Sequence, residues 1–260
     1  MHTLGILGIG DLTEKVVRGL RRSGYAGRIY LSPRNAELAT ALAAECDCEV
    51  MDSNQAVVDN SQGVLLGVRP EAVDQVAGEV FFKRGQGLMS LVAGISLERL
   101  AQAFPGARCL RVMLSYAVLY NQSTVVLCPP DPVGEAILAR LGNLVVLEDE
   151  SGFELATVAA CMNGWFYFLL NDLQQWLADK GLPASQARAL VLGNLMDCVA
   201  SAKQQPENSL KAMGMAIATP GTFTAEGLAV LNDQPFDATW GAACEAVLNA
   251  LLTRSLLAPR

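Results

Sequence analysis

The stretch Leu4-Gly5-Ile6-Leu7-Gly8-Ile9-Gly10-Asp11-Leu12-Thr13 decides the fold of this chain. It begins as a short apolar strand and passes through a glycine turn into a segment whose apolar residues recur at helical spacing. Glycine at position 8 permits a tight turn, and glycine at position 10 lets a pyrophosphate approach the backbone. The next helix then directs its free N–H groups at the phosphates. The pattern predicts a dinucleotide-binding turn formed by Gly8, Ile9, Gly10, Asp11 and Leu12.

Two residues of this turn depart from the usual G-x-G-x-x-G pattern. Thr13 stands at the third glycine position, so the motif taken alone also fits an ordinary strand–helix turn. Asp11 carries a charge that opposes phosphates, and we expect it to cap the helix instead. The strand before the turn and the helical spacing after it favour dinucleotide binding.

Residues 1–147 alternate strands with helices, which predicts an α/β, Rossmann-type, doubly wound sheet that is mostly parallel. Strands are expected at 3–7, 28–32, 49–51, 63–68, 87–93, 109–113, 124–128 and 144–147. Ligands bind at the carboxyl ends of such strands. The residues expected at that edge, besides the glycine turn, are Ser32, Arg34, Val68, Arg69, Pro70, Ala93 and Gly94.

Residues 148–260 are predicted to form an all-α domain, because the strand pattern stops after Glu148-Asp149-Glu150. A helix is expected over 152–178, and it is apolar nearly all round at Trp165-Phe166-Tyr167-Phe168-Leu169-Leu170. Its longest uncharged run, Leu155 to Asn171, has 17 residues, fewer than the ~20 of a membrane span. We therefore expect a buried helix in a domain that packs against a second copy of the chain as a homodimer.

The composition is that of a soluble protein. The net charge of −7 makes nucleic acid and anionic membranes poor partners. Seven dispersed cysteines and one histidine supply too few ligands in any one place to predict a metal site. The cysteines and the absence of a recognisable signal peptide predict a cytoplasmic protein.

The second strand predicts which dinucleotide is bound. A domain that prefers NAD usually ends this strand with Asp or Glu, which binds the ribose 2′-OH. Here the strand ends in Ser32-Pro33-Arg34-Asn35, and Arg34 is suited to pair with a 2′-phosphate. The alternative is that Arg34 is a solvated loop residue. We expect NADPH (NADP+) as the cofactor.

Several ordered blocks of this sequence resemble the pyrroline-5-carboxylate reductase family along nearly the whole chain. The blocks are Gly8-Ile9-Gly10, Arg18-Gly19-Leu20, Val68-Arg69-Pro70, Ser90-Leu91-Val92-Ala93-Gly94-Ile95, Leu110-Arg111-Val112-Met113, Gly181-Leu182-Pro183 and Thr219-Pro220-Gly221-Thr222-Phe223-Thr224. The resemblance implies an NAD(P)H-dependent reductase of a cyclic imine, which forms L-proline. It also implies dimers that interlock through the helical domain and often associate into larger rings.

The departures from the family fall at its substrate-binding motifs. M-P-N-T-P reads Met113-Leu114-Ser115-Tyr116-Ala117, and the S-G-S-G-P-A-Y motif falls at Ala160 to Phe166. In S-P-G-G-T-T the second glycine becomes Thr222 and the first threonine becomes Phe223. The resemblance places the substrate near Asn163, Trp165, Thr222, Phe223 and Thr224. Trp165 and Phe223 either line a more apolar pocket or belong to the core.

The proton donor is left open by the sequence. Thr224 keeps its place in the family motif and is the candidate catalytic residue, although it also suits the N-cap of a helix over 225–231. Tyr116 and Tyr167 are alternative donors, but packed aromatics are more common. Two functions therefore remain: an imine reductase, and a catalytically lapsed NADP-binding homodimer with a binding or regulatory role.

Overall fold

The computed structural model describes residues 2–234 and 236–257, and they form two compact units. The first comprises the chain up to Ala160 and the segment from Leu248, and the second comprises Cys161–Val247. The predicted boundary at residue 147 marks the change from strands to helices. The two compact units divide at a different place, within the helix that follows residue 147. The domain boundary at residue 147 therefore stays a prediction.

The first unit is a mixed eight-stranded sheet in the order β3-β2-β1-β4-β5-β6-β7-β8. Only the β6–β7 pair is antiparallel among the pairings of this sheet. The strands are β1 (Leu4–Leu7), β2 (Ile29–Leu31), β3 (Glu49–Val50), β4 (Gly63–Leu66), β5 (Gly87–Ser90), β6 (Arg108–Met113), β7 (Ser123–Cys128) and β8 (Gly142–Val146). All eight predicted strands are found, so the Rossmann-type prediction is confirmed.

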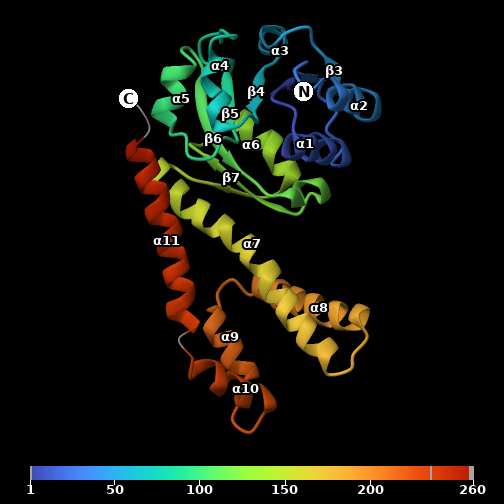
Figure 1. The fold of residues 1–260 in the computed structure, drawn as a ribbon, viewed down its shortest axis with the longest axis vertical. Helices are drawn as coiled ribbons and strands as arrows, with labels where there is room; N and C mark the ends of the chain where they lie inside the picture. Colours follow the sequence, from blue (N-terminus) through green and yellow to red (C-terminus); the bar gives the residue numbers. More distant parts are fainter. Residues whose placement is uncertain (1, 235, 258–260) are drawn as a thin grey trace. The chain divides into compact units, whose positions relative to one another are not determined.

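Helices cover both faces of the sheet (Figure 1). They are α1 (Asp11–Arg22), α2 (Ala36–Cys46), α3 (Asn54–Asn60), α4 (Val73–Ala77), α5 (Leu97–Ala103) and α6 (Pro132–Leu138). Short 3₁₀ turns are η1 (Pro70–Ala72), η2 (Tyr116–Tyr120) and η3 (Ala139–Leu141).

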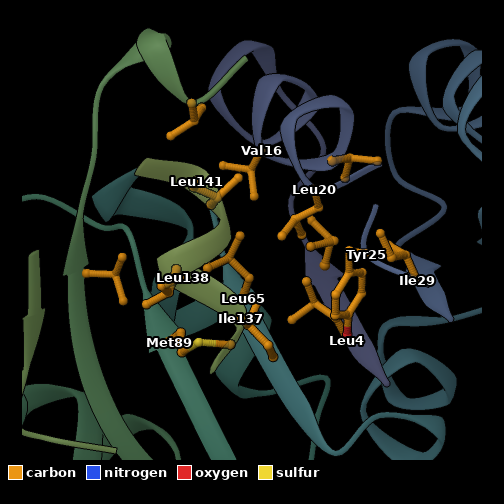
Figure 2. Close-up of a cluster of buried hydrophobic side chains, with 14 of the residues drawn as sticks. Leu4, Val16, Leu20, Tyr25, Ile29, Leu65, Met89, Ile137, Leu138 and Leu141 are labelled. Atoms are coloured by element: carbon orange, nitrogen blue, oxygen red, sulfur yellow. The ribbon is translucent and has the colours of Figure 1, made fainter. Parts of the chain in front are cut away.

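Two hydrophobic cores lie on opposite faces of the sheet because successive strand residues point in opposite directions. In β1, Leu4 and Ile6 join the core under α1, α2 and α6, part of which Figure 2 shows. Leu7 joins the core under α3, α4 and α5. All four residues of β1 are buried, as expected for a parallel strand covered on both faces.

The remaining helices are α7 (Glu150–Asp179), α8 (Ala184–Gln204), α9 (Leu210–Ile217), α10 (Phe223–Asn232) and α11 (Phe236–Leu257). The helical prediction for this part of the chain is confirmed, although α9 was not predicted. Within the second unit, Trp240 of α11 contacts two rings of α7. Its centroid lies 5.9 Å from that of Trp165, edge-to-face, and 5.6 Å from that of Phe166, stacked.

Most of α7 is exposed in a single chain, so its burial between two copies of the chain stays a prediction. Only Phe153 and Val158 of this helix are buried, whereas Tyr167 and Phe168 are 71% and 74% exposed. By length and composition α7 would also suit a membrane span, with 11% of its most apolar window buried. A single helix of this kind is weak evidence of a membrane, because core helices of soluble proteins pass the same test.

Candidate cofactor and substrate sites

The glycine turn between β1 and α1 has the geometry that the sequence predicts. Gly8 has φ +87°, and a Cβ there would lie 2.5 Å from Val68 Cγ1. Position 8 therefore requires glycine on both conformational and steric grounds. A Cβ at Gly10 would meet no atom within 4 Å, so the backbone there faces open space. A phosphate group has room to approach the turn at Gly10.

Thr13 completes this turn although it replaces the third glycine. Its hydroxyl oxygen accepts a hydrogen bond from the Gly10 N–H at 2.8 Å. The same hydroxyl donates to the Gly8 carbonyl oxygen, with 3.0 Å between the two oxygens. The third glycine normally allows a helix and a strand to pack closely. Here Gly67, directly after β4, provides the space: a Cβ at Gly67 would lie 2.1 Å from Thr13 Cγ2.

The end of β2 holds the turn through two polar side chains. The hydroxyl of Ser32, which is fully buried, accepts a hydrogen bond from the Gly8 N–H at 3.1 Å. Asn35 Nδ2 donates to the Ile9 carbonyl oxygen at 3.1 Å, and the Ile9 side chain is itself buried. Ser32 and Ile9 therefore set the shape of the turn, and sequence reasoning missed the role of Asn35.

Arg34 is exposed at the rim of a cavity of about 400 Å³. The cavity is lined by Pro33, Arg34, Ser53, Asn54, Gln75 and Glu79. The Arg34 guanidinium makes no hydrogen bond or ion pair within residues 2–234 and 236–257, and Asn54 Oδ1 is buried without a partner there. Glu79 is engaged, because its carboxylate accepts from Asn54 Nδ2 at 2.5 Å and from Gln75 Nε2 at 3.2 Å. The cavity thus offers an unpaired cation to a ligand.

Asp11 does not cap α1, which corrects the expectation from the sequence. Gly10 is the N-cap, and Asp11 forms an ion pair with Lys15 one turn along the helix. The hydrogen bond from Lys15 lowers the pKa of Asp11, and the lysine offsets the charge that would oppose phosphates.

Tyr116 belongs to the same surface cluster and is not a packed aromatic. It is 57% exposed, and Lys15 Nζ lies 4.5 Å from its ring centroid. A hydrogen bond to the Asp11 carboxylate raises the pKa of the Tyr116 hydroxyl, which therefore stays protonated at neutral pH. Tyr167 is exposed as well, so neither tyrosine is part of the core of this chain.

A second cavity, of about 80 Å³, lies where β5 and β6 end. The predicted residues Leu12, Ala93 and Gly94 line it. Its other lining residues are Leu91, Val92, Arg111, Val112, Met113, Leu114, Phe153 and Thr157. Of the remaining predicted residues, Val68 packs beside Gly8, while Arg69 and Pro70 are exposed where η1 begins.

Arg111 is a buried cation in the wall of this second cavity. It is 3% exposed, and its Nη1 donates to Glu150 Oε1 at 2.7 Å and to Glu154 Oε1 at 2.6 Å. Its guanidinium lies 4.1 Å from the ring centroid of Phe153. Sequence reasoning missed this cluster. The only signal was two glutamates four residues apart on one helix, because only the fold brings them to β6.

The predicted substrate residues belong to the second unit and form two groups. Asn163 is exposed on α7, where Trp165 packs against Trp240. Thr222, Phe223 and Thr224 begin α10. No hydrogen bond or ring contact joins the two groups within the described part of the chain.

Thr222, rather than Thr224, caps α10, which corrects the alternative considered for Thr224. The Thr222 hydroxyl accepts from the Ala225 N–H at 3.2 Å and donates to the Thr219 carbonyl oxygen at 2.8 Å. The Thr224 hydroxyl is not used by the cap. Phe223 is 90% exposed and so does not belong to the core of this chain.

The described residues include no group of three or more His, Cys, Asp or Glu side chains placed to hold a metal. Burial raises the pKa of the Cys48, Cys109 and Cys128 thiols to about 11. These three thiols are therefore protonated at neutral pH and poorly suited to act as nucleophiles.

Two separate parts of the chain match models of known protein families. Residues 3–94 match the family model described as NADP oxidoreductase coenzyme F420-dependent. Residues 150–252 match the model of the pyrroline-5-carboxylate reductase dimerisation domain. The chain is 26% identical to the pyrroline-5-carboxylate reductase of Haemophilus influenzae over 265 residues, which cover 97% of this chain and 96% of that protein. These matches together support membership of the pyrroline-5-carboxylate reductase family.

Solved structures of family members share the fold along their full length. A pyrroline-5-carboxylate reductase from Coxiella burnetii has a TM-score of 0.89 at 18% identity, covering 98% of each chain. The Plasmodium falciparum pyrroline carboxylate reductase, solved with NADP bound, has a TM-score of 0.82 at 17% identity and the same coverage. The matches support an NAD(P)H-dependent oxidoreductase with a Rossmann-type domain and a pyrroline-5-carboxylate reductase dimerisation domain.

Proposed function

We propose that this enzyme transfers a hydride from NADPH to the C=N bond of a cyclic imine. The default substrate is pyrroline-5-carboxylate, which would be reduced to L-proline, the reaction in the name of its relatives. The observation that carries the proposal is the glycine turn at Gly8 and Gly10, open at its surface and followed by the unpaired Arg34. The imine carbon accepts the hydride, and the imine nitrogen takes up one proton.

The preference for NADPH over NADH rests on the first cavity. The strand β2 ends without a carboxylate to bind a ribose 2′-OH, and Arg34 lies unpaired at the rim. A guanidinium binds a phosphate through charge-assisted hydrogen bonds. The 2′-phosphate of NADPH would therefore gain a cation that NADH cannot use.

The second cavity suits the nicotinamide end of the cofactor. It is lined by Leu12 of the glycine-turn segment and by Ala93 and Gly94 after β5. The residues lie at the carboxyl edge of the sheet, where open α/β sheets bind ligands. Their apolar character would exclude water from the hydride-transfer step.

The substrate is expected to be larger or less anionic than pyrroline-5-carboxylate. Thr222 and Phe223 replace the small residues that bind the substrate carboxylate in the family, and the Thr222 hydroxyl is occupied as a helix cap. Thr224 is proposed as the catalytic residue that contacts the substrate or passes on its proton. Asn163 and Trp165 are proposed to contribute to the same pocket from α7.

We further propose that the enzyme is a homodimer, with rings of dimers as a further possibility, in the cytoplasm. The exposed side chains of α7 include Leu155, Phe166, Phe168, Leu173 and Trp176. An apolar surface of this size does not stay in water. A second copy of the dimerisation domain would cover it, and a membrane is not needed to do so.

The alternative is a homodimer that binds NADPH without catalysis. The observation that favours it is the altered α10 start, where Phe223 stands 90% exposed in place of a hydrogen-bonding threonine. Under this alternative the cofactor turn would still be required, so cofactor binding alone does not separate the two functions.

The deciding experiment measures NADPH oxidation at 340 nm with pyrroline-5-carboxylate and with larger cyclic imines. We expect poor turnover of pyrroline-5-carboxylate and faster turnover of a larger or uncharged imine. Efficient turnover of pyrroline-5-carboxylate, at ~10⁴ M⁻¹s⁻¹ or more, would refute the altered pocket.

The double variant Thr222→Gly with Phe223→Thr restores the family motif and should raise activity on pyrroline-5-carboxylate. Glycine at an N-cap costs only a few tenths of a kcal/mol, so the fold should survive. The single variant Thr222→Gly is the matched control, because it removes the cap without restoring the threonine. If neither the natural protein nor the double variant oxidises NADPH with any imine, the non-catalytic alternative is correct.

A further inference from the structure

One buried donor of the Arg111 side chain has no hydrogen-bond partner within the described part of the chain. Its Nη1 binds Glu150 and Glu154, but its Nε is buried without any hydrogen-bond partner among the described residues. An unsatisfied buried N–H, above all on a charged group, is strongly unfavourable. Arg111 also lines the cavity at the ends of β5 and β6, so the group that satisfies Nε can come from a ligand there.

The charges around the cavity define the kind of ligand. Arg111 carries one positive charge and its two glutamate partners carry two negative charges, so the cluster is net negative. A free anion is therefore disfavoured, whereas a neutral group with a strong acceptor oxygen suits the Nε–H donor. The lining residue Thr157 adds a complementary acceptor. Its hydroxyl proton is donated to the Phe153 carbonyl oxygen at 2.9 Å, which leaves the oxygen's lone pairs free.

A primary carboxamide presents both groups that these two residues require. We propose that Arg111 Nε–H donates to the carboxamide oxygen of the nicotinamide and that Thr157 Oγ1 accepts from its NH₂ group, an assignment that rests on the proposed function. The remaining walls, Val92, Val112, Met113 and Leu114, supply apolar contact for a ring. Arg111 is thus a cofactor-binding residue that fixes which way the nicotinamide ring is turned.

The test compares two ligands on two variants by intrinsic fluorescence. NADP+ carries the nicotinamide, and 2′-phospho-ADP-ribose is the same molecule without it. Arg111→Lys keeps a cation for both glutamates and replaces the Nε–H with a methylene group. We expect this variant to raise the Kd of NADP+ about tenfold to a hundredfold and to leave 2′-phospho-ADP-ribose within about twofold. The control Arg34→Ala should weaken both ligands equally.

A second measurement needs no variant of Arg111. Thionicotinamide-NADP+ replaces the carboxamide oxygen with sulfur, which is a weaker acceptor. The natural protein should therefore bind NADP+ more tightly than the thio analogue, and Arg111→Lys should bind the two alike. This comparison in the natural protein decides the question even if Arg111→Lys does not fold.

Two results would overturn the assignment. Equal losses for NADP+ and 2′-phospho-ADP-ribose in Arg111→Lys would show that the side chain only supports the fold, with water as the partner of Nε. Equal affinity of the natural protein for NADP+ and its thio analogue would show that the carboxamide oxygen is not bound. If the natural protein binds neither NADP+ nor 2′-phospho-ADP-ribose, the proposed function fails first.

Discussion

The contact between Thr13 and Gly67 predicts a reciprocal pair of substitutions at the cofactor turn. A Cβ at position 67 would lie 2.1 Å from Thr13 Cγ2, well inside van der Waals contact. Gly67→Ala therefore overpacks the interface between α1 and the end of β4. Overpacking of this kind costs about 1–3 kcal/mol. Thr13→Ser removes the methyl group and keeps the hydroxyl, at a cost of about 1 kcal/mol for a buried methyl.

The double variant should lose less free energy of unfolding than the two single variants lose when their losses are added. Without Thr13 Cγ2, the nearest remaining atom to the new Cβ is the Gly8 carbonyl oxygen at 3.3 Å, which requires only a small shift. Position 67 is not among the residues with positive φ, so alanine is compatible with its backbone. We expect a favourable interaction energy of about 1–2 kcal/mol in the double-mutant cycle.

Urea unfolding followed by circular dichroism measures this cycle, and NADPH titration measures its effect on the turn. Gly67→Ala alone should also weaken NADPH, because the clash acts on the residue that binds the Gly10 N–H. Thr13→Val is the matched control: it keeps a methyl group against Gly67 but loses the hydroxyl, so the double variant with Gly67→Ala should show no rescue. Strict additivity of Thr13→Ser and Gly67→Ala would refute the reasoning.

Three further predictions concern the cofactor, the assembly and the thiols. In fluorescence titrations, Arg34→Ala should raise the Kd of NADPH about tenfold or more and leave the Kd of NADH unchanged. If the protein binds NADPH and NADH with equal affinity, and the variant changes neither, the role of Arg34 is contradicted. Light scattering at micromolar concentration should show a dimer. Phe168→Glu places a charge on the exposed face of α7 and should shift the protein toward monomers or aggregates. A stable monomer of the natural protein would count against the proposed interface. Burial raises the pKa of Cys128 from 9.0 to about 11, so the unfolded chain loses this proton first as the pH rises. The contribution of this thiol to stability should therefore be constant below about pH 9 and fall between pH 9 and 11 in urea unfolding. Cys128→Ala should show a smaller fall in stability over this range than the natural protein. An equal fall in both proteins would exclude this thiol as a cause.

Local pattern was sufficient for the order of the elements. The apolar runs 63–66 and 87–90 are fully buried strands, and the glycine spacing at Gly8 and Gly10 identified the turn. The long helix from Glu150 to Asp179 followed from its unbroken apolar and helix-favouring sequence. These features depend on residues that are neighbours in the chain, so their physical causes are visible in the sequence.

The roles of single side chains depended on the tertiary structure. Thr13 could be accepted at a glycine position only because Gly67, brought beside it by the pairing of β1 with β4, leaves room for its methyl group. Arg111 finds its partners 39 and 43 residues away, on a helix that only the fold brings to β6.

The same limit explains the wrong expectations. Helix-cap identity at Asp11 and Thr224 was misassigned by one and two positions, because a cap depends on where the backbone turns helical. The sequence by itself determined a Rossmann-type sheet followed by a helical domain, since periodicity and glycine placement act locally. Packing between distant segments decided which donors are satisfied, and it is this that leaves Arg34 and the Nε of Arg111 without partners within the described chain.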